Sequence, residues 1–298
     1  MSQRFRAWLQ LLRAPNLFTV PGDPLAGFLL ATYGGLDWRV LVPIAASLCF
    51  YSAGLLMNDL CDLEEDRRER PNRPLPARQV STGAVRRAIL LLGGIGLLAL
   101  IVGTNFVAAG VGIGLLGLIA LYNGFTKRAA GIGALNMGLC RAFSLILGAA
   151  AANPSFATRA PGAWDAAAIL CAYIAAVTFL AGFETKTRAP VLAKLLPALA
   201  ALAGLVVIFQ ATGYLQIPYA TAIFAVGFIA VTAETCKLFG RNSPPLPPSI
   251  GSFIRLLLVF QAAFCVIYGF GWTGRVCAIS LVLLLPIAAM TSRRFYAS

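Results

Sequence analysis

Long apolar stretches separated by short polar connections dominate this 298-residue chain. An apolar run of roughly 20 residues is long enough to cross a bilayer as a helix. Several of these runs contain Gly or Pro, which membrane helices tolerate. The apolar segments lie at about 16–35, 40–60, 84–103, 105–122, 131–152, 164–183, 191–212, 215–236, 252–271 and 275–292. The pattern predicts an all-α polytopic transmembrane helical bundle of about nine or ten helices, forming a single integral membrane domain over residues 1–298.

The two ends of the chain carry less regular patterns. The first apolar segment is interrupted at 21–24 by Pro-Gly-Asp-Pro, and we expect a kink there because proline breaks helical hydrogen bonding. The last two segments are compatible with two helices, or with one helix and a re-entrant or interfacial segment. Residues 1–14 are basic and amphipathic and lack a signal-peptide cleavage site. They predict an interfacial N-terminal helix, with Trp8 at the membrane surface.

Charge is scarce and unevenly distributed. Only 12% of the residues are charged, against about 25% in soluble domains. If the N-terminus is inside, most basic residues fall on the inner side, as the positive-inside rule requires. This places the N-terminus and the loops at 58–81, 123–130 and 184–190 on the cytoplasmic side of the inner membrane. The net charge of +13 is thus explained mostly by topology and lipid contact, and no basic domain suggests nucleic acid as a partner.

Acidic residues are concentrated at the inner end of the second apolar segment. Six of the chain's eleven lie between Asp59 and Glu69. The spacing N-D-x-x-D-x-x-x-D puts Asn58, Asp59, Asp62 and Asp66 on one face if the helix continues inward. Such oxygen donors suit Mg²⁺, which commonly bridges carboxylates to substrate phosphates. A solvated, salt-bridged loop is the alternative for a bare acidic run, and the ordered spacing favours the metal site.

Other residue types exclude several chemistries. The chain contains no histidine, which excludes His-based triads, His metal sites and imidazole proton shuttles. Its seven cysteines are scattered and never form a C-x-x-C pair, so we interpret them as small core residues.

The run from Asn58 to Ser81 resembles the first signature of the UbiA superfamily of intramembrane prenyltransferases. It reads N-D-x-x-D-x-x-x-D, then R-x-x-R-P-L-P and V-S. The stretch Y-N-G-F-T-K-R at 122–128 resembles the family's Y-x-x-x-K loop, with one extra residue before the lysine. The likeness covers roughly residues 10–240. N-M-G-L-C-R-A-F-S-L-I-L-G and the ending S-R-R-F-Y resemble a divergent UbiA-like subgroup, the EboC-type proteins.

The resemblance implies a site and a reaction. Transferases of this family ionise an allylic diphosphate and join its polyprenyl chain to an aromatic or other small acceptor. By resemblance, the metal ligands for Mg²⁺ are Asn58, Asp59, Asp62 and Asp66. The carboxylates and Lys127 are the candidate catalytic residues, and the candidate substrate-binding residues of these two motifs are Arg70, Arg73 and Tyr122. The partners implied are a prenyl diphosphate, a small acceptor and membrane lipid.

One part of the chain departs from the family pattern. The family has a second acidic motif, D-x-x-x-D, on the inner loop after the sixth helix, where this chain reads A-G-F-E-T-K-T-R-A-P. Glu184 is the acidic residue there, and Lys186 and Arg188 stand where more acid is expected. Either the cations replace a second Mg²⁺ electrostatically, or catalysis is altered or lost. The alternative function is therefore a non-catalytic prenyl-phosphate binding or transport protein.

Ionisable residues inside apolar runs are functional candidates because their burial is costly. Arg141 is either a phosphate ligand facing a cavity or the structural partner of an acid. Asp23 either orients or deprotonates an acceptor, or caps a broken helix. Asn16 is a candidate polar group of the cavity. Glu234 is best explained by an i,i+3 pair with Lys237.

Overall fold

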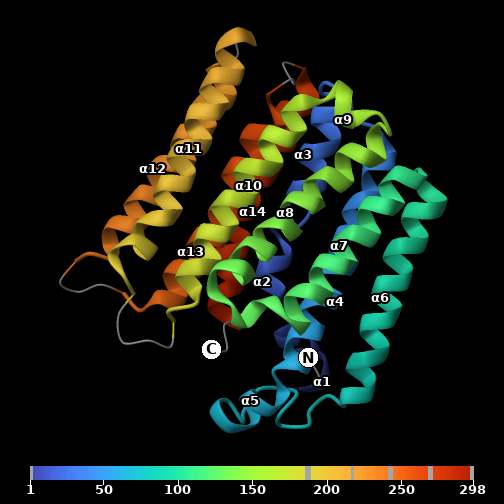
Figure 1. Cartoon of the computed structure of the whole chain (residues 1–298), viewed down its shortest axis with the longest axis vertical. Helices are drawn as coiled ribbons and strands as arrows, with labels where there is room; N and C mark the ends of the chain where they lie inside the picture. Colours follow the sequence, from blue (N-terminus) through green and yellow to red (C-terminus); the bar gives the residue numbers. More distant parts are fainter. Residues whose placement is uncertain (1–2, 185–188, 216–217, 241–243, 268–270, 296–298) are drawn as a thin grey trace.

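The protein is a bundle of long, roughly aligned helices (Figure 1). Our computed structural model describes residues 3–184, 189–215, 218–240, 244–267 and 271–295. Within these ranges all regular secondary structure is helical, which confirms the predicted all-α class.

Nine helices of the described ranges are long and apolar enough to cross a membrane. They are α4 (Leu41–Cys61), α6 (Thr82–Gly103), α7 (Phe106–Gly124), α8 (Ala130–Ala152), α10 (Pro161–Ala181), α11 (Val191–Leu215), α12 (Pro218–Lys237), α13 (Leu246–Cys265) and α14 (Trp272–Phe295). The shorter elements are α1 (Gln3–Leu11), α2 (Ala14–Leu17), α3 (Gly22–Ala31), η1 (Trp38–Val40), α5 (Leu63–Glu69), η2 (Thr126–Arg128) and α9 (Phe156–Arg159). The last two apolar segments are thus two long helices, and the chain is a multi-pass membrane protein.

The first apolar segment is broken, as the sequence predicts, but the break lies a few residues earlier than expected. Gly22, Asp23 and Pro24 belong to the first turn of α3, where a proline is tolerated. The segment forms α2 and α3, with a turn between Leu17 and Gly22. The turn leaves the carbonyl of Thr19 outside both helices, and this oxygen is used by side chains of two other helices. The break explains why this segment adds no tenth long span to the nine found in the described residues.

The α3 helix lies unusually close to α8. A Cβ added at Gly27 would lie 1.9 Å from the Leu145 carbonyl oxygen, and one added at Gly148 would lie 1.9 Å from that of Pro24. Only glycine fits at these two backbone contacts. The close approach fixes the broken segment against the centre of the bundle.

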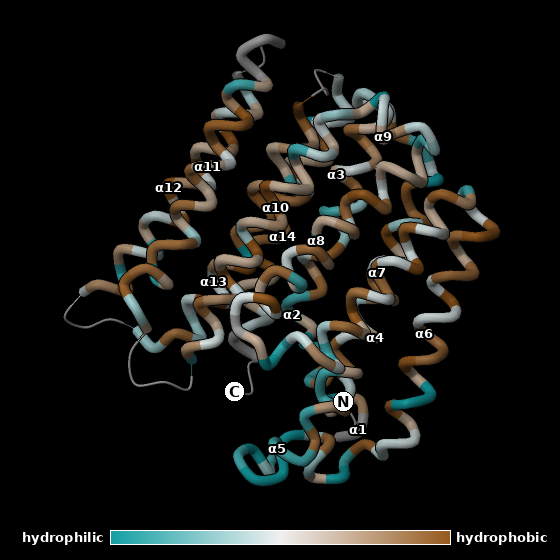
Figure 2. Tube along the Cα trace, in the orientation of Figure 1, coloured by the Kyte–Doolittle hydropathy of each residue, from teal (hydrophilic) through white to brown (hydrophobic). Residues whose placement is uncertain are grey.

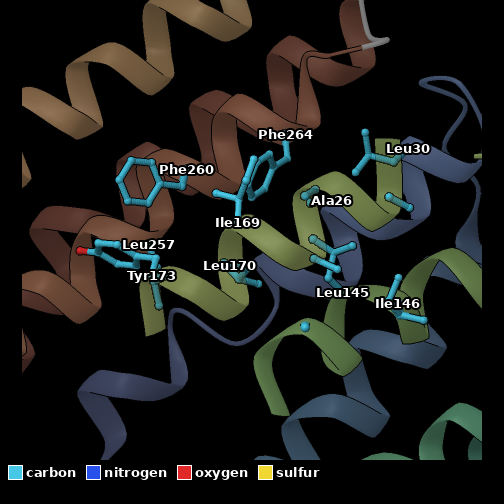
Figure 3. Close-up of a cluster of buried hydrophobic side chains, with 14 of the residues drawn as sticks. Ala26, Leu30, Leu145, Ile146, Ile169, Leu170, Tyr173, Leu257, Phe260 and Phe264 are labelled. Carbon is cyan, nitrogen blue, oxygen red and sulfur yellow. The ribbon is translucent and has the colours of Figure 1, made fainter. Parts of the chain in front are cut away.

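The centre of the bundle is formed by α3, α8, α10 and α13. Figure 3 shows Leu145 of α8, Leu170 and Tyr173 of α10, and Phe260 of α13 in this core. The Tyr173 and Phe260 rings meet edge to face with centroids 4.9 Å apart. The buried Tyr173 hydroxyl donates to the Phe253 carbonyl oxygen at 2.9 Å. Aromatic packing and a satisfied hydroxyl therefore connect α10 to α13.

The peripheral helices expose apolar side chains. On α6 and α7 these include Leu90, Val102 and Phe106, the last 88% exposed. Figure 2 shows the hydrophobic colouring along α6, α11 and α12 at the edges of the bundle. Exposed apolar surface of this extent indicates an apolar surrounding medium, consistent with a bilayer.

The two ends of the bundle differ in chemistry. At one end, α1, α5 and the connection to α6 surround a second small core, built by Ala7, Leu11, Leu56, Leu75 and Val80 with Val85. This end is hydrophilic around α5 (Figure 2). Exposed tryptophans begin spans at the other end, namely Trp38, Trp164 and Trp272. The apolar packing of the second core orders the polar loop that carries the sequence motif.

We predict that Gly27→Ala destabilises the protein by about 1–3 kcal/mol, the range for overpacked cores. The added methyl group would collide with backbone atoms of α8, which cannot rotate away. Thermal unfolding in detergent measures the effect. Gly110→Ala on α7 is the matched control, because a Cβ there meets nothing within 4 Å. Equal midpoints for the two variants would contradict the close-approach interpretation.

Candidate functional site

The acidic motif lies across the junction of α4 and α5. Asn58 and Asp59 are in the last turn of α4, and Asp66 is in α5. Asp62 joins the helices with φ −90° and ψ 2°. Helical hydrogen bonds continue through the junction, from the Asp62 amide to the Asn58 carbonyl at 2.9 Å and from the Asp66 amide to the Asp62 carbonyl at 2.8 Å. The predicted inward continuation is thus nearly right, and these residues follow one helical path.

Each motif aspartate contacts a basic side chain from a different part of the chain. Asp59 is 3.5 Å from the guanidinium of Arg13. Lys127, from η2, donates to Asp62. Arg73 Nη1 donates to both Asp66 carboxylate oxygens, at 3.0 and 2.9 Å. The structure therefore brings the predicted acidic and basic motifs together and adds Arg13, to which the sequence analysis gave no role in the site.

Arg13 owes its position to an unusual backbone. It stands between α1 and α2 with φ 44° and ψ 54°, in the left-handed region. This conformation is uncommon for a residue other than glycine. The turn directs the chain from the surface helix into the bundle and brings the guanidinium to Asp59. In the sequence, Arg13 is a single arginine before Ala-Pro-Asn. The positive-inside rule already accounted for it, so no pattern marked it as part of the site.

Glu184, in the degenerate second motif, lies near the first motif. Partial desolvation raises the pKa of its carboxyl group, and the nearby positive charges of Arg70 and Arg13 offset only part of this increase. The predicted residues Arg70 and Glu184 are therefore neighbours. Lys186 and Arg188 lie outside the described residues.

A cavity extends from the acidic motif into the bundle between α4, α7 and α8. Its volume is about 130 Å³, and it is partly open to the outside. Asn58, Tyr122 and Arg13 line the motif end. Ser47, which also lines the cavity, lies eleven residues before Asn58 on α4, or about 16 Å along the helix. The cavity thus reaches deep into the membrane-spanning part of the protein.

The wall of the cavity has an apolar and a polar face. Leu115 and Ile119 of α7 and Met137 of α8 are apolar. Ser47 and Ser144 contribute hydroxyl groups that share a hydrogen bond, with their oxygens 2.6 Å apart. The cavity therefore offers an apolar surface on one side and hydrogen-bonding groups on the other.

Behind the polar face lies a buried ion pair. Arg141 Nε is 3.0 Å from Asp23 Oδ2, and Arg141 Nη2 donates to the Thr19 carbonyl oxygen at 2.8 Å. Gln261 of α13 donates to the same carbonyl at 2.8 Å and to Asp23 Oδ1 at 2.6 Å. Arg141 therefore has an acid partner and lines the cavity at once. Asp23 lies in the first turn of α3, whose N-cap residue is Pro21, and Asn16 lies against the cavity residue Tyr51.

The oxygen donors at the motif suit Mg²⁺ in their chemistry, since Asn58, Asp59, Asp62 and Asp66 offer amide and carboxylate oxygens beside the cavity. Their arrangement here is that of ion pairs. Among the residues that the structure describes, no three Asp, Glu, Cys or His side chains are grouped closely enough to hold a metal ion. The donor set fits Mg²⁺ once the basic partners Arg13, Arg73 and Lys127 move away from the carboxylates.

The fold and the site define a multi-pass membrane protein with an acidic and basic motif at the mouth of an intramembrane cavity. Residues 24–235 match the model of the UbiA prenyltransferase family. This match covers more than half of the chain, which belongs to that family. The narrower resemblance to the EboC-type subgroup stays a prediction.

Curated relatives match over shorter stretches. The digeranylgeranylglyceryl phosphate synthase of Sulfolobus acidocaldarius is 27% identical over 93 residues, which are 31% of this chain and 34% of that protein. The synthase of the same name from Ignicoccus hospitalis is 33% identical over 103 residues, 34% of this chain and 33% of that protein. The chain thus aligns with about a third of the length of these relatives.

Solved structures match over nearly the whole chain. The apo structure of a UbiA homologue from Aeropyrum pernix K1 has a TM-score of 0.68 at 16% identity and covers 84% of this chain and 97% of its own. A homologue from Archaeoglobus fulgidus, bound to GPP and Mg²⁺, has a TM-score of 0.64 at 14% identity, covering 88% and 99%. At such identities the likeness establishes a shared fold.

We predict that Arg73→Gln lowers the free energy of unfolding by about 1–3 kcal/mol, because buried Asp66 loses two charge-assisted hydrogen bonds. Arg67→Gln is the matched control, since its partner Glu64 is mostly exposed, and an exposed pair contributes less than about 1 kcal/mol. Thermal unfolding of both variants in detergent tests this difference. A loss as large for Arg67→Gln would show that burial of the Asp66 pair is not what stabilises the loop.

Proposed function

We propose that this protein transfers a prenyl group from a polyprenyl diphosphate to a small acceptor within the membrane, in a Mg²⁺-dependent reaction. The observation that supports this most directly is the position of the acidic and basic motif. Asp59, Asp62 and Asp66, with Arg73 and Lys127, lie together at the mouth of a largely apolar cavity. A diphosphate needs the first environment and its isoprenoid chain needs the second.

In this proposal the residues divide into metal-holding and diphosphate-holding groups. Asn58, Asp59, Asp62 and Asp66 would hold Mg²⁺, which supplies charge neutralisation of the leaving diphosphate. The basic and phenolic groups would donate to diphosphate oxygens; they are Arg70, Arg73, Lys127 and Tyr122. Lys127 is well placed because it lies beside Asp62 and is itself largely buried.

The reaction breaks the bond between the allylic C1 and the diphosphate oxygen, and the electron pair leaves with the diphosphate. The acceptor forms the new bond to C1 and loses a proton. The enclosed wall of α4, α7 and α8 limits competing capture by water. Tyr51 and Tyr122 line this space, and aromatic faces stabilise a nearby cation.

Three further observations support the proposal. The chain belongs to a prenyltransferase family. Its relatives from Sulfolobus acidocaldarius and Ignicoccus hospitalis are named as synthases, and the Archaeoglobus fulgidus homologue binds GPP with Mg²⁺. By the positive-inside rule, the motif end would face the cytoplasm, in the inner membrane.

A second candidate function is binding or transport of a prenyl phosphate without transfer. It is favoured by the degenerate second motif, where Glu184 is the acidic residue and is near the charges of Arg70 and Arg13. A carrier would retain the first motif and the apolar wall. It would bind prenyl diphosphate and release no diphosphate.

The test is release of inorganic diphosphate by purified protein in lipid nanodiscs, supplied with geranyl, farnesyl and geranylgeranyl diphosphates and a panel of acceptors. We expect acceptor-stimulated release that EDTA abolishes. Asp62→Ala should lower the rate by about 10²-fold or more, because a ligand and the partner of Lys127 are lost together. Asp37→Asn, an exposed residue beside the tryptophan end, is the control and should leave the rate unchanged.

Two results would contradict the transfer proposal. Full release by Asp62→Ala would remove the first motif from the reaction. Mg²⁺-dependent binding of prenyl diphosphate by the unaltered protein, with no release for any acceptor, would favour the carrier.

A further inference from the structure

The deep end of the cavity, which lies farthest from the acidic motif, is polar, although membrane-spanning helices surround it. Ser47 and Tyr51 of α4 and Arg141 and Ser144 of α8 line it. Each pair is spaced three or four residues apart, so each lies on one face of its helix. Polar groups at this depth are costly unless they serve a purpose. This face therefore requires an explanation beyond diphosphate binding, which the proposed function assigns to the motif end.

The positive charge of Arg141 on this face is balanced by a neighbouring carboxylate. Arg141 is 6% exposed and pairs with Asp23, which is fully buried. Gln261 donates to Asp23 and to the carbonyl oxygen of Thr19, which also accepts from Arg141. If Arg141 swung towards a free anion, the Asp23 carboxylate would be left buried and uncompensated, which is strongly unfavourable.

The network is also fixed sterically. A Cβ on Gly22 would lie 2.1 Å from Gln261 Oε1, so the amide of Gln261 occupies the space that a side chain would take. Gln261 is 0% exposed. The ion pair is thus held between the broken first segment, α8 and α13, and its geometry is set before any ligand arrives.

The cavity as a whole offers no unpaired cation along its wall. Its lining residues all belong to the described part of the chain, and the charged ones are Arg13 and Arg141. Arg13 pairs with Asp59 at the mouth, and Arg141 pairs with Asp23 at the deep end. An anionic group that enters the deep end of the cavity therefore meets a wall with no net formal charge.

We propose that the deep end of the cavity is the acceptor subsite and that it takes an uncharged hydroxyl compound, an alcohol or a phenol. The proposal rests on the proposed transfer function and names its acceptor class. A guanidinium has five N–H donors, so Arg141 can donate to a neutral oxygen while it stays paired with Asp23. The hydroxyls of Ser47, Ser144 and Tyr51 can both donate to and accept from such a ligand.

A carboxylate or phosphate is disfavoured by the same geometry. It would bring an additional negative charge close to Asp23, in a region where charge is poorly screened. An isoprenoid is disfavoured as well, because it would remove this polar face from water while leaving the remaining donors and acceptors of its hydroxyls and guanidinium unused. The apolar residues Leu115 and Ile119 offer the isoprenoid a better surface.

The first experiment uses the unaltered protein in nanodiscs and two acceptor pairs that differ in charge, 4-hydroxybenzyl alcohol against 4-hydroxybenzoate and glycerol against glycerate. With geranylgeranyl diphosphate and Mg²⁺, we expect kcat/KM to favour the neutral member of each pair by at least about tenfold, because like charges in an interior repel strongly. Equal rates, or a preference for the carboxylates, would overturn the proposal.

Binding separates this inference from the transfer function. If no diphosphate is released with any acceptor, the transfer function fails, and calorimetric titration of the same pairs still decides the acceptor class. Tighter binding of the neutral members supports the subsite. Tighter or equal binding of the carboxylates overturns it.

A charge variant tests the role of the ion pair. Asp23→Asn removes the countercharge, so the preference for neutral over anionic acceptors should fall at least about tenfold, whatever happens to the absolute rate. Glu234→Gln is the matched control, since it also removes a carboxylate from an ion pair, with Lys237, outside the cavity. It should leave the preference unchanged. An unchanged preference in folded Asp23→Asn would overturn the proposed selectivity.

A second variant covers the case in which Asp23→Asn does not fold. Ser144→Ala keeps the charges and removes one hydroxyl from the subsite. We expect a higher KM for the neutral acceptor and an unchanged KM for the prenyl diphosphate. A change confined to the prenyl diphosphate would assign this face to the isoprenoid and overturn the proposal.

Discussion

The rest of this structure depends on one constraint: charged side chains that are removed from water must be paired with opposite charges. In a membrane-spanning bundle an uncompensated charge is expensive, and removal of one partner of a buried pair is more expensive than the pair itself. Asp23 and Arg141 satisfy the requirement deep in the bundle. Asp62 with Lys127 and Asp66 with Arg73 satisfy it at the motif end.

The same pairs determine the architecture. The ion pair of Asp23 and Arg141, completed by Gln261, joins the broken first segment to α8 and α13. The pair of Asp62 and Lys127 joins the α4–α5 junction to the short helix η2. Connections that are distant in sequence are therefore made by charged and polar groups, while apolar packing around Tyr173 fills the space between them.

The sequence predicts the parts of this fold that a bilayer dictates. Span length follows from membrane thickness, and a break in the first segment follows from its prolines. The spans could therefore be located in advance, and the break between α2 and α3 to within a few residues. The motif spacing also located Asp59, Asp62 and Asp66, because helical periodicity is local.

The partners of these residues could not be predicted in the same way. Gln261 binds Thr19 across 242 positions and Arg141 binds it across 122, and such contacts depend on tertiary packing that no local pattern encodes. Gln261 is an uncharged side chain within an apolar run, and only its polarity distinguished it. Arg13 resembled the other basic residues of its surface, although its left-handed backbone brings it to Asp59.

The ion pairs of the motif have a consequence for the order of binding. The three carboxylates and their partners Arg13, Lys127 and Arg73 balance each other in charge. A divalent cation alone would leave this cluster positive, and a diphosphate alone would leave it negative. In the proposed reaction the carboxylates would turn to the metal and the basic groups to the phosphate oxygens, so that each group would exchange one opposite charge for another. Charge balance in this partly buried cluster would therefore favour joint binding of metal and diphosphate over binding of either one alone.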